Sequence, residues 1–171
     1  MKGEGEIAMA IKIVLGDITQ LPQRMDAIVN AANRRLVPGG GVDGAINAAA
    51  GPELAQAMLA INGTPTGTAV MTPAFGLNAS YVIHAVGPIY HTGRANEAGL
   101  LRRAYYSAFN LMTRHALRTV AVPLLSTGVY GYPIPEAVAI AINVAHDFPE
   151  LTITFVALEP EVFAQLERMT A

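Results

Sequence analysis

Residues 26–51 read DAIVNAANRRLVPGGGVDGAINAAAG, and the rest of the chain is organised around this stretch. Residues 26–30 are typical of a short buried strand, residues 31–41 form a small-residue loop that ends in three glycines, and residues 42–50 predict a helix. A glycine run that enters a helix N-terminus is a potential anion site, because its backbone N–H groups are free and no Cβ blocks approach. The stretch therefore predicts a place where an anionic ligand binds.

Asp43 lies in the first turn of this predicted helix, where a carboxylate beside an anion site would repel the anion. Two explanations stay open from the residues alone. The carboxylate can interact favourably with the helix dipole. It can also act as a base beside a bound phosphorylated ligand.

Length and composition limit the classes of protein that fit. The 171 residues are enough for one domain with a full core, and 52% hydrophobic against 14% charged residues disfavours disorder. A formal charge of −2 gives no basic footprint, so we expect no nucleic-acid partner. The absence of Cys excludes disulfides and thiolate metal sites.

No apolar run reaches the length of a membrane span, and the head of the chain lacks the apolar core of a signal peptide. Residues 1–10, which contain GEGE, are predicted to be a flexible leader. We therefore expect a cytoplasmic protein that does not bind a membrane. The sequence leaves its oligomeric state open.

Strand and helix patterns alternate along residues 11–171, which we expect to form a single domain. Apolar strands are predicted at 11–15, 26–30, 69–72, 81–86, 119–125 and 151–158. Helices are predicted at 42–50, from Pro52 towards Gly63, around 101–112, from Pro135 to about 145, and at 160–169. The pattern indicates an α/β fold, a three-layer α/β/α sandwich with a mixed, mostly parallel central sheet.

Residues 126–132 form a second glycine-containing loop directly after a predicted strand. Ligands of α/β sheets bind outside the carboxyl ends of the strands. Small residues and two glycines would allow the backbone N–H groups of this loop to bind a pyrophosphate. The same composition is also typical of an ordinary turn, so both interpretations stay possible. Residues 87–99 likewise allow two interpretations, a lid over a ligand or an ordinary connector.

Three other kinds of site are disfavoured. Gly39, Gly41 and Gly44 spell the G-x-G-x-x-G motif of a Rossmann dinucleotide site. Such a site needs the motif directly after a strand and an acid roughly 20 residues further on, whereas here eight residues separate strand and motif, and no acid occurs between Glu53 and Glu97. A P-loop NTPase is disfavoured because the chain has no G-x-x-x-x-G-K-[ST] motif. The four histidines, at 84, 91, 115 and 146, lack metal-ligand spacing, and His84 is expected to be a hydrogen-bonded core histidine.

Four short motifs occur in a recognisable order: GDIT at 16–19, DAIVNAAN at 26–33, GGGVDGAI at 39–46 and STGVYGYP at 126–133. Together they resemble the macrodomain family, and within it the MacroD-type ADP-ribosyl hydrolases. The resemblance covers nearly the whole chain. It implies the macrodomain fold, ADP-ribose as the ligand, and neither a cofactor nor a metal.

The resemblance also implies roles for individual residues. Asp43 would orient or deprotonate a water, and Asn33 would position ribose hydroxyls through its carboxamide. Asp17 would accept the adenine amino group with Ile18 against the ring, although Asp17 could instead cap a turn. The other residues expected to bind the ligand lie in or beside the two glycine loops: Asn30, Gly39, Gly40, Gly41, Val42, Ser126, Thr127, Gly128, Val129 and Tyr130.

The activity implied by the resemblance is hydrolysis of an ester on the terminal ribose. Such esters include mono-ADP-ribosylated Asp or Glu on proteins, which would then be partners, and O-acetyl-ADP-ribose. A phosphate of the substrate could orient the water instead, with Asp43 only supporting the geometry. A module that binds ADP-ribose and recruits partners without turnover is the alternative, and Asp43 argues against it because non-catalytic macrodomains usually lack an acid there.

The chain departs from the family pattern at three positions. Asn47 stands where histidine is common, and Pro38 stands where a fourth glycine is common. Ala157 aligns with an aromatic that lies against the adenine in many members. We expect Ala157 to stand at the adenine wall, where a phenylalanine would stack on the purine.

Overall fold

The structure, a computed structural model, describes residues 10–170. Residues 1–9, which are most of the predicted leader, and residue 171 lie outside the described residues. Strand β1 begins at Ala10, the last residue assigned to that leader. The strands are β1 (Ala10–Leu15), β2 (Met25–Ala31), β3 (Ala69–Pro73), β4 (Ala79–Ala85), β5 (Thr119–Val122) and β6 (Thr152–Ala157). The helices are α1 (Gly41–Ala50), α2 (Pro52–Ile61), α3 (Glu97–Arg114), α4 (Ile134–Ala145) and α5 (Pro160–Thr170).

The strands form one six-stranded sheet in the order β1-β6-β5-β2-β4-β3. Strand β3 runs antiparallel to β4, and the other neighbouring strands are parallel. The prediction of a mixed, mostly parallel sheet is confirmed. Because the strands are parallel, the carboxyl ends of β2, β4 and β5 meet at one edge of the sheet, which is where ligands of such sheets bind.

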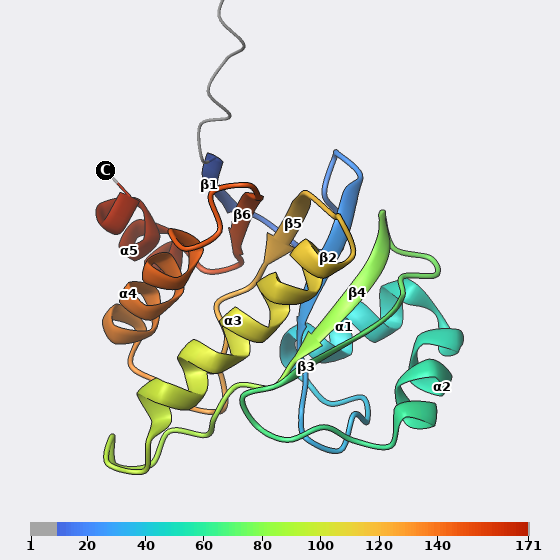
Figure 1. Cartoon of the computed structure of the whole chain (residues 1–171), viewed down its shortest axis with the longest axis horizontal. Coiled ribbons are helices and arrows are strands. Elements are labelled where there is room, and N and C mark those ends of the chain that lie inside the picture. Colours follow the sequence, from blue (N-terminus) through green and yellow to red (C-terminus); the bar gives the residue numbers. More distant parts are fainter. Residues whose placement is uncertain (1–9, 171) are drawn as a thin grey trace, which may run out of the picture.

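Helices cover both faces of this sheet, with α3, α4 and α5 on one side and α1 and α2 on the other (Figure 1). Alternation along β2 shows how the two cores are separated. Ala27 and Val29 pack into the core beneath α3–α5, while Ile28 packs into the core beneath α1 and α2. The three-layer α/β/α sandwich predicted from the sequence is therefore confirmed.

Helix α3 shows why the sequence places its apolar face inward. Leu101, Tyr105, Phe109 and Met112 are fully buried and fall on one helical stripe. The hydroxyl of Tyr105 also accepts a hydrogen bond of 2.8 Å from the backbone N–H of Leu125. The helix thus fixes the chain directly before the second glycine loop.

Most predicted elements differ from the observed ones only at their ends. Strand β5 ends at Val122, three residues before the predicted end, and residues 123–125 continue without strand pairing. Helix α1 begins at Gly41, one residue early. Within residues 10–170, no helix combines the length and apolar character that crossing a membrane requires.

Ala157 does not occupy the position expected for it. Its side chain is 3% exposed and packs into the core beneath α3–α5, whereas the preceding Val156 belongs to the opposite core. The expectation that Ala157 forms the adenine wall is therefore wrong in this structure. The misplacement has a simple cause, because a shift of one position along a strand moves a side chain to the other face.

Ala157→Phe is accordingly expected to destabilise the fold. A ring forced into this filled core would lower the free energy of unfolding by about 1–3 kcal/mol, the usual cost of overpacking. Leu158 is 72% exposed and offers a matched control, since Leu158→Phe adds a ring outside the core. Chemical denaturation of both variants would measure the difference, and equal stability of the two would contradict the assignment.

Candidate functional site

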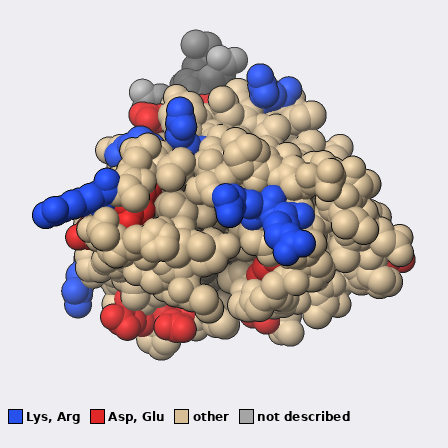
Figure 2. All heavy atoms as spheres, turned by 90° about the horizontal axis from the view of Figure 1, so that it is seen from below, with Lys and Arg blue, Asp and Glu red and all other residues tan. Residues whose placement is uncertain are grey.

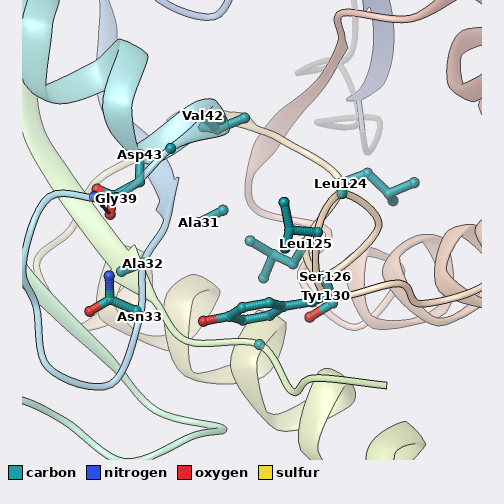
Figure 3. A pocket seen from close by; sticks show the side chains of 15 residues that line it. Ala31, Ala32, Asn33, Gly39, Val42, Asp43, Leu124, Leu125, Ser126 and Tyr130 are labelled. Carbon is teal, nitrogen blue, oxygen red and sulfur yellow. Dashed lines mark hydrogen bonds between the residues drawn. The ribbon is translucent and has the colours of Figure 1, made fainter. Parts of the chain in front are cut away.

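A cavity of about 300 Å³ lies between the two glycine-containing loops, beyond the ends of β2 and β5 (Figure 3). Ten of the predicted site residues line it: Asn33, Gly39, Gly40, Gly41, Val42, Asp43, Ser126, Gly128, Val129 and Tyr130. Five lining residues were not predicted: Ala31, Ala32, Gly87, Leu124 and Leu125. Ala31 and Ala32 lie in the first predicted loop, and Leu124 and Leu125 directly precede the second. Their position in the sequence could therefore have identified these four as lining residues.

Four predicted site residues do not line the cavity: Asp17, Ile18, Asn30 and Thr127. Asp17 is exposed and accepts hydrogen bonds from the backbone N–H and the hydroxyl of Thr19. These two bonds lower the pKa of Asp17, which therefore caps the turn after β1. Ile18 is buried in the core beneath α1 and α2.

The turn after β2 is built around a buried leucine. The backbone N–H of Leu36 bonds to the carbonyl of Asn33 at 3.1 Å, and the Leu36 side chain is fully buried. The carboxamide of Asn33 donates to the Val37 carbonyl at 2.7 Å and accepts from the Val37 N–H at 3.3 Å. These bonds fix the orientation of Asn33 and leave one N–H and one lone pair of its carboxamide for a ligand.

Asp43 is 4% exposed and is held by three uncharged groups. Its Oδ1 accepts from Asn30 Nδ2 and from Asn47 Nδ2, each at 2.9 Å. Its Oδ2 accepts from the backbone N–H of Gly39 at 3.0 Å. Burial raises the pKa of Asp43, and the three hydrogen bonds oppose that rise only in part. A carboxylate in this state is a better proton acceptor than an exposed one.

Gly39 brings Asp43 and Asn33 to the same small space. A methyl group added at Gly39 would lie 3.5 Å from Asp43 Oδ2 and 3.6 Å from Asn33 Nδ2. Figure 3 shows these two side chains on the same side of the cavity, with the ring of Tyr130 extending towards them. The arrangement gives a proton acceptor and an amide donor that can act on one bound group.

Gly44 permits the close packing on which this loop depends. A Cβ at Gly44 would lie 2.7 Å from the carbonyl oxygen of Gly39, so any side chain in this turn of α1 would push the loop away. The contact fixes the backbone that donates to Asp43.

The second loop forms the opposite wall of the cavity. Ser126 is a non-glycine residue with φ +68, and its buried hydroxyl has no hydrogen-bond partner among the described residues. The backbone N–H of Tyr132 donates to the Ser126 carbonyl at 2.8 Å, which closes the loop. Strain and an unpaired polar group of this kind are typical of functional sites.

Glu97, which the sequence analysis missed, holds the segment between β4 and α3. Its buried carboxylate accepts hydrogen bonds from four backbone N–H groups, those of His91, Thr92, Gly93 and Ala95. The bond from His91, together with those from Gly93 and Ala95, lowers the pKa of Glu97 to about 2.

The same segment contacts the second glycine-containing loop. The Tyr90 N–H donates to the Tyr130 carbonyl at 2.8 Å, and the rings of Tyr90 and Tyr132 meet edge to face at 4.9 Å. Of the two interpretations left open for residues 87–99, this geometry favours a connector, which is held against the second loop, over a lid.

Charge does not define the site. Figure 2 looks at the face that is lowest in Figure 1, where basic side chains stand in separate groups on a mostly uncharged surface. The described part of the chain contains no group of three or more His, Asp or Glu side chains that could hold a metal ion. Among the residues that line the cavity, only Asp43 is charged.

Comparison with known proteins agrees with this geometry. Residues 29–141 match the family model described as Macro domain. The chain belongs to the macrodomain family. It is 45% identical over 169 residues to a protein of Citrobacter koseri named O-acetyl-ADP-ribose deacetylase, covering 93% of this chain and 94% of that one.

Solved macrodomain structures superpose closely on the chain. A macrodomain of Oceanobacillus iheyensis with ADP has a TM-score of 0.87 at 36% identity, covering 97% of this chain and 93% of that chain. A Trypanosoma brucei macrodomain in complex with ADP-ribose has a TM-score of 0.87 at 35% identity, covering 94% and 69%. The family resemblance stated from the motifs is confirmed.

Gly44→Ala tests the packing of the first loop. The overlap with the Gly39 carbonyl costs about 1–3 kcal/mol, against a gain in helix propensity of about 1 kcal/mol. We expect a net loss of up to about 2 kcal/mol in the free energy of unfolding. Gly40→Ala is the matched control, because nothing lies within 4 Å of its added methyl and its φ is −91. Thermal unfolding without ligand would compare them, and a stabilised Gly44→Ala would contradict the assigned contact.

Glu97→Gln tests the carboxylate that holds residues 91–95. A neutral amide accepts these N–H groups less well, so their hydrogen exchange should be faster and the Tm lower at pH 7. Glu97 stabilises the fold above its unfolded pKa of 4.5, and this contribution is lost as the pH falls towards about 2. The difference in Tm between wild type and variant should therefore shrink below pH 4.5. Identical exchange rates at pH 7 would contradict the role.

Proposed function

We propose that this protein binds ADP-ribose in the cavity and hydrolyses esters on the terminal ribose, both O-acetyl-ADP-ribose and mono-ADP-ribosylated Asp or Glu on proteins. The observation that carries the proposal is the buried Asp43 carboxylate, which shares a small space with the Asn33 amide. The name of the Citrobacter koseri relative and the ADP-ribose in the trypanosomal structure support the reaction and the ligand.

The two loops suit a pyrophosphate without any basic side chain. Residues 39–42 lie at the N-terminus of α1, and Ser126, Gly128 and Val129 face them across the cavity. Backbone N–H groups at a helix N-terminus and in a tight loop bind phosphate oxygens well. A ligand held this way would place its terminal ribose near Asn33, Asp43 and Tyr130.

The chemistry proposed for Asp43 follows from its two oxygens. Oδ1 already accepts two amide donors, whereas Oδ2 accepts only the Gly39 N–H and lies near Asn33. Oδ2 would accept a proton from a water while the oxygen of that water attacks the ester carbonyl carbon. The bond between that carbon and the ribose oxygen then breaks, and the ribose oxygen takes up the proton that Asp43 accepted. The products are a carboxylic acid and free ADP-ribose.

Release of ADP-ribose is the direct test. The protein is incubated with a glutamate-ADP-ribosylated protein and, in parallel, with O-acetyl-ADP-ribose, and free ADP-ribose is measured. Release from both supports the full proposal, and release from the small ester alone restricts it to that class. Binding of ADP-ribose without release from either substrate would support a module that recruits partners.

Asp43→Asn should abolish turnover while preserving or tightening ADP-ribose binding. The change removes a negative charge near a dianion and leaves the side-chain shape nearly unchanged. A loss of turnover of at least about 100-fold is expected for a general base. In the wild type, turnover should fall as the pH drops through the raised pKa of Asp43, because the protonated acid cannot accept a proton. Calorimetry and rate measurements decide, and a variant with wild-type turnover would exclude Asp43 as the base.

A further inference from the structure

Asn30 is the support for Asp43 that lies deepest in the protein. It sits in β2, is fully buried, and does not line the cavity, and its expected role in binding the ligand stays a prediction. Its Nδ2 carries two hydrogens. One points to Asp43 Oδ1 at 2.9 Å, and the other points to His84 Nδ1 at 3.0 Å.

The amide of Asn30 has one orientation that fits its two neighbours. A carboxylate only accepts hydrogen bonds, so the edge of the amide that faces Asp43 must be the NH₂ group. The reversed amide would turn Oδ1 towards both the carboxylate and the lone pair of His84 Nδ1. The orientation that stabilises Asp43 therefore depends on His84 Nδ1 being an acceptor.

Thr72 fixes the tautomer of His84. Thr72 Oγ1 lies 2.9 Å from His84 Nε2 and donates its own hydrogen to the Pro73 carbonyl at 3.0 Å. With its hydrogen on that carbonyl, the threonine oxygen accepts from Nε2–H, which leaves Nδ1 unprotonated, the tautomer that the NH₂ group of Asn30 also requires. Burial lowers the pKa of His84 to about 4, so the ring stays neutral near pH 7.

Sheet register places these residues in line. Asn30 and His84 are directly paired on the parallel strands β2 and β4, and Thr72, on the antiparallel edge strand β3, pairs with Val82, two residues before His84. Thr72, His84 and Asn30 are each at most 4% exposed. Both ring nitrogens of His84 are hydrogen-bonded, as expected for a core histidine, and the partner on the Nδ1 side leads directly to Asp43.

We propose that His84 and Thr72 are positioning residues, which act through the Asn30 amide to keep the Asp43 carboxylate oriented and ionised for the hydrolytic reaction. The inference rests on the proposed function for its catalytic consequence. The effect on Asp43 itself is independent of substrate and can be measured without turnover.

Three variants separate the hydrogen bonds from simple packing. His84→Leu removes both ring nitrogens. His84→Asn keeps an acceptor at the position of Nδ1, and Thr72→Val replaces the hydroxyl by a methyl of similar size. His146→Leu, at an exposed histidine remote from the cavity, is the matched control.

The first measurement is the pKa of Asp43, which is determined by NMR titration of protein labelled with ¹³C at the aspartate carboxyls. The chain has four aspartates, and Asp43→Asn assigns the signal. In His84→Leu the pKa of Asp43 should rise by about 1, the order expected for losing one hydrogen bond to a charge. His84→Asn should restore most of the wild-type value, Thr72→Val should give a smaller rise, and the control should give none.

The second measurement is turnover of O-acetyl-ADP-ribose beside calorimetric binding of ADP-ribose. In His84→Leu kcat should fall about 10- to 100-fold, the range for a small misplacement of a reacting group. The Kd should change by less than about twofold, because His84 does not line the cavity. A folded His84→Leu with unchanged kcat and unchanged Asp43 pKa would overturn the proposal, as would His84→Asn behaving like His84→Leu.

Two further outcomes are also decisive. If His84→Leu fails to fold, Thr72→Val is the test, and unchanged kcat and pKa in that variant would overturn the proposal. If the wild type does not hydrolyse the ester, the proposed reaction fails, yet a raised Asp43 pKa in His84→Leu would still establish the positioning role.

Discussion

The site depends on one buried carboxylate, Asp43, whose partners among the described residues are all uncharged. Removing a carboxylate from water costs several kcal/mol even after the protein relaxes, and Asp43 is only 4% exposed. Three uncharged donors offset this cost, and they come from three different segments: strand β2, the glycine loop and helix α1. The relative placement of those segments is therefore constrained by Asp43, and a displaced segment would leave the charge without one of its donors.

A second carboxylate plays a comparable part on the other side of the cavity. Glu97 is buried and accepts four backbone N–H groups, which keeps the segment after β4 against the second loop. The two acids thus accept hydrogen bonds from donors inside the protein, and of the glycines that line the cavity only Gly39 gives its N–H to one of them. This division is consistent with a protein of formal charge −2 that is proposed to hold a dianion.

Sequence patterns predicted most of the fold and about two thirds of the site, for identifiable reasons. Alternating apolar strands and helices specify layers, and glycine runs after strands specify loops that bind anions. Ala157 was misplaced because the face of a strand residue depends on its register, which packing decides. Glu97 was missed because its partners belong to a loop whose path is set only in the folded protein. Local patterns carry no record of such tertiary hydrogen bonds.

The precision of this site comes from the interior of the sheet more than from its loops. Asn30 and His84 are register partners in two central strands, so their separation is fixed by backbone ladders that loop motion cannot alter. A site supported by strands is more precise than one supported by loops alone. Polar residues inside strands are costly unless they are fully hydrogen-bonded, and the alignment of Thr72, His84 and Asn30 meets most of that cost. The cavity-facing loops then meet the ligand while contributing a single donor, the Gly39 N–H, to the support of Asp43.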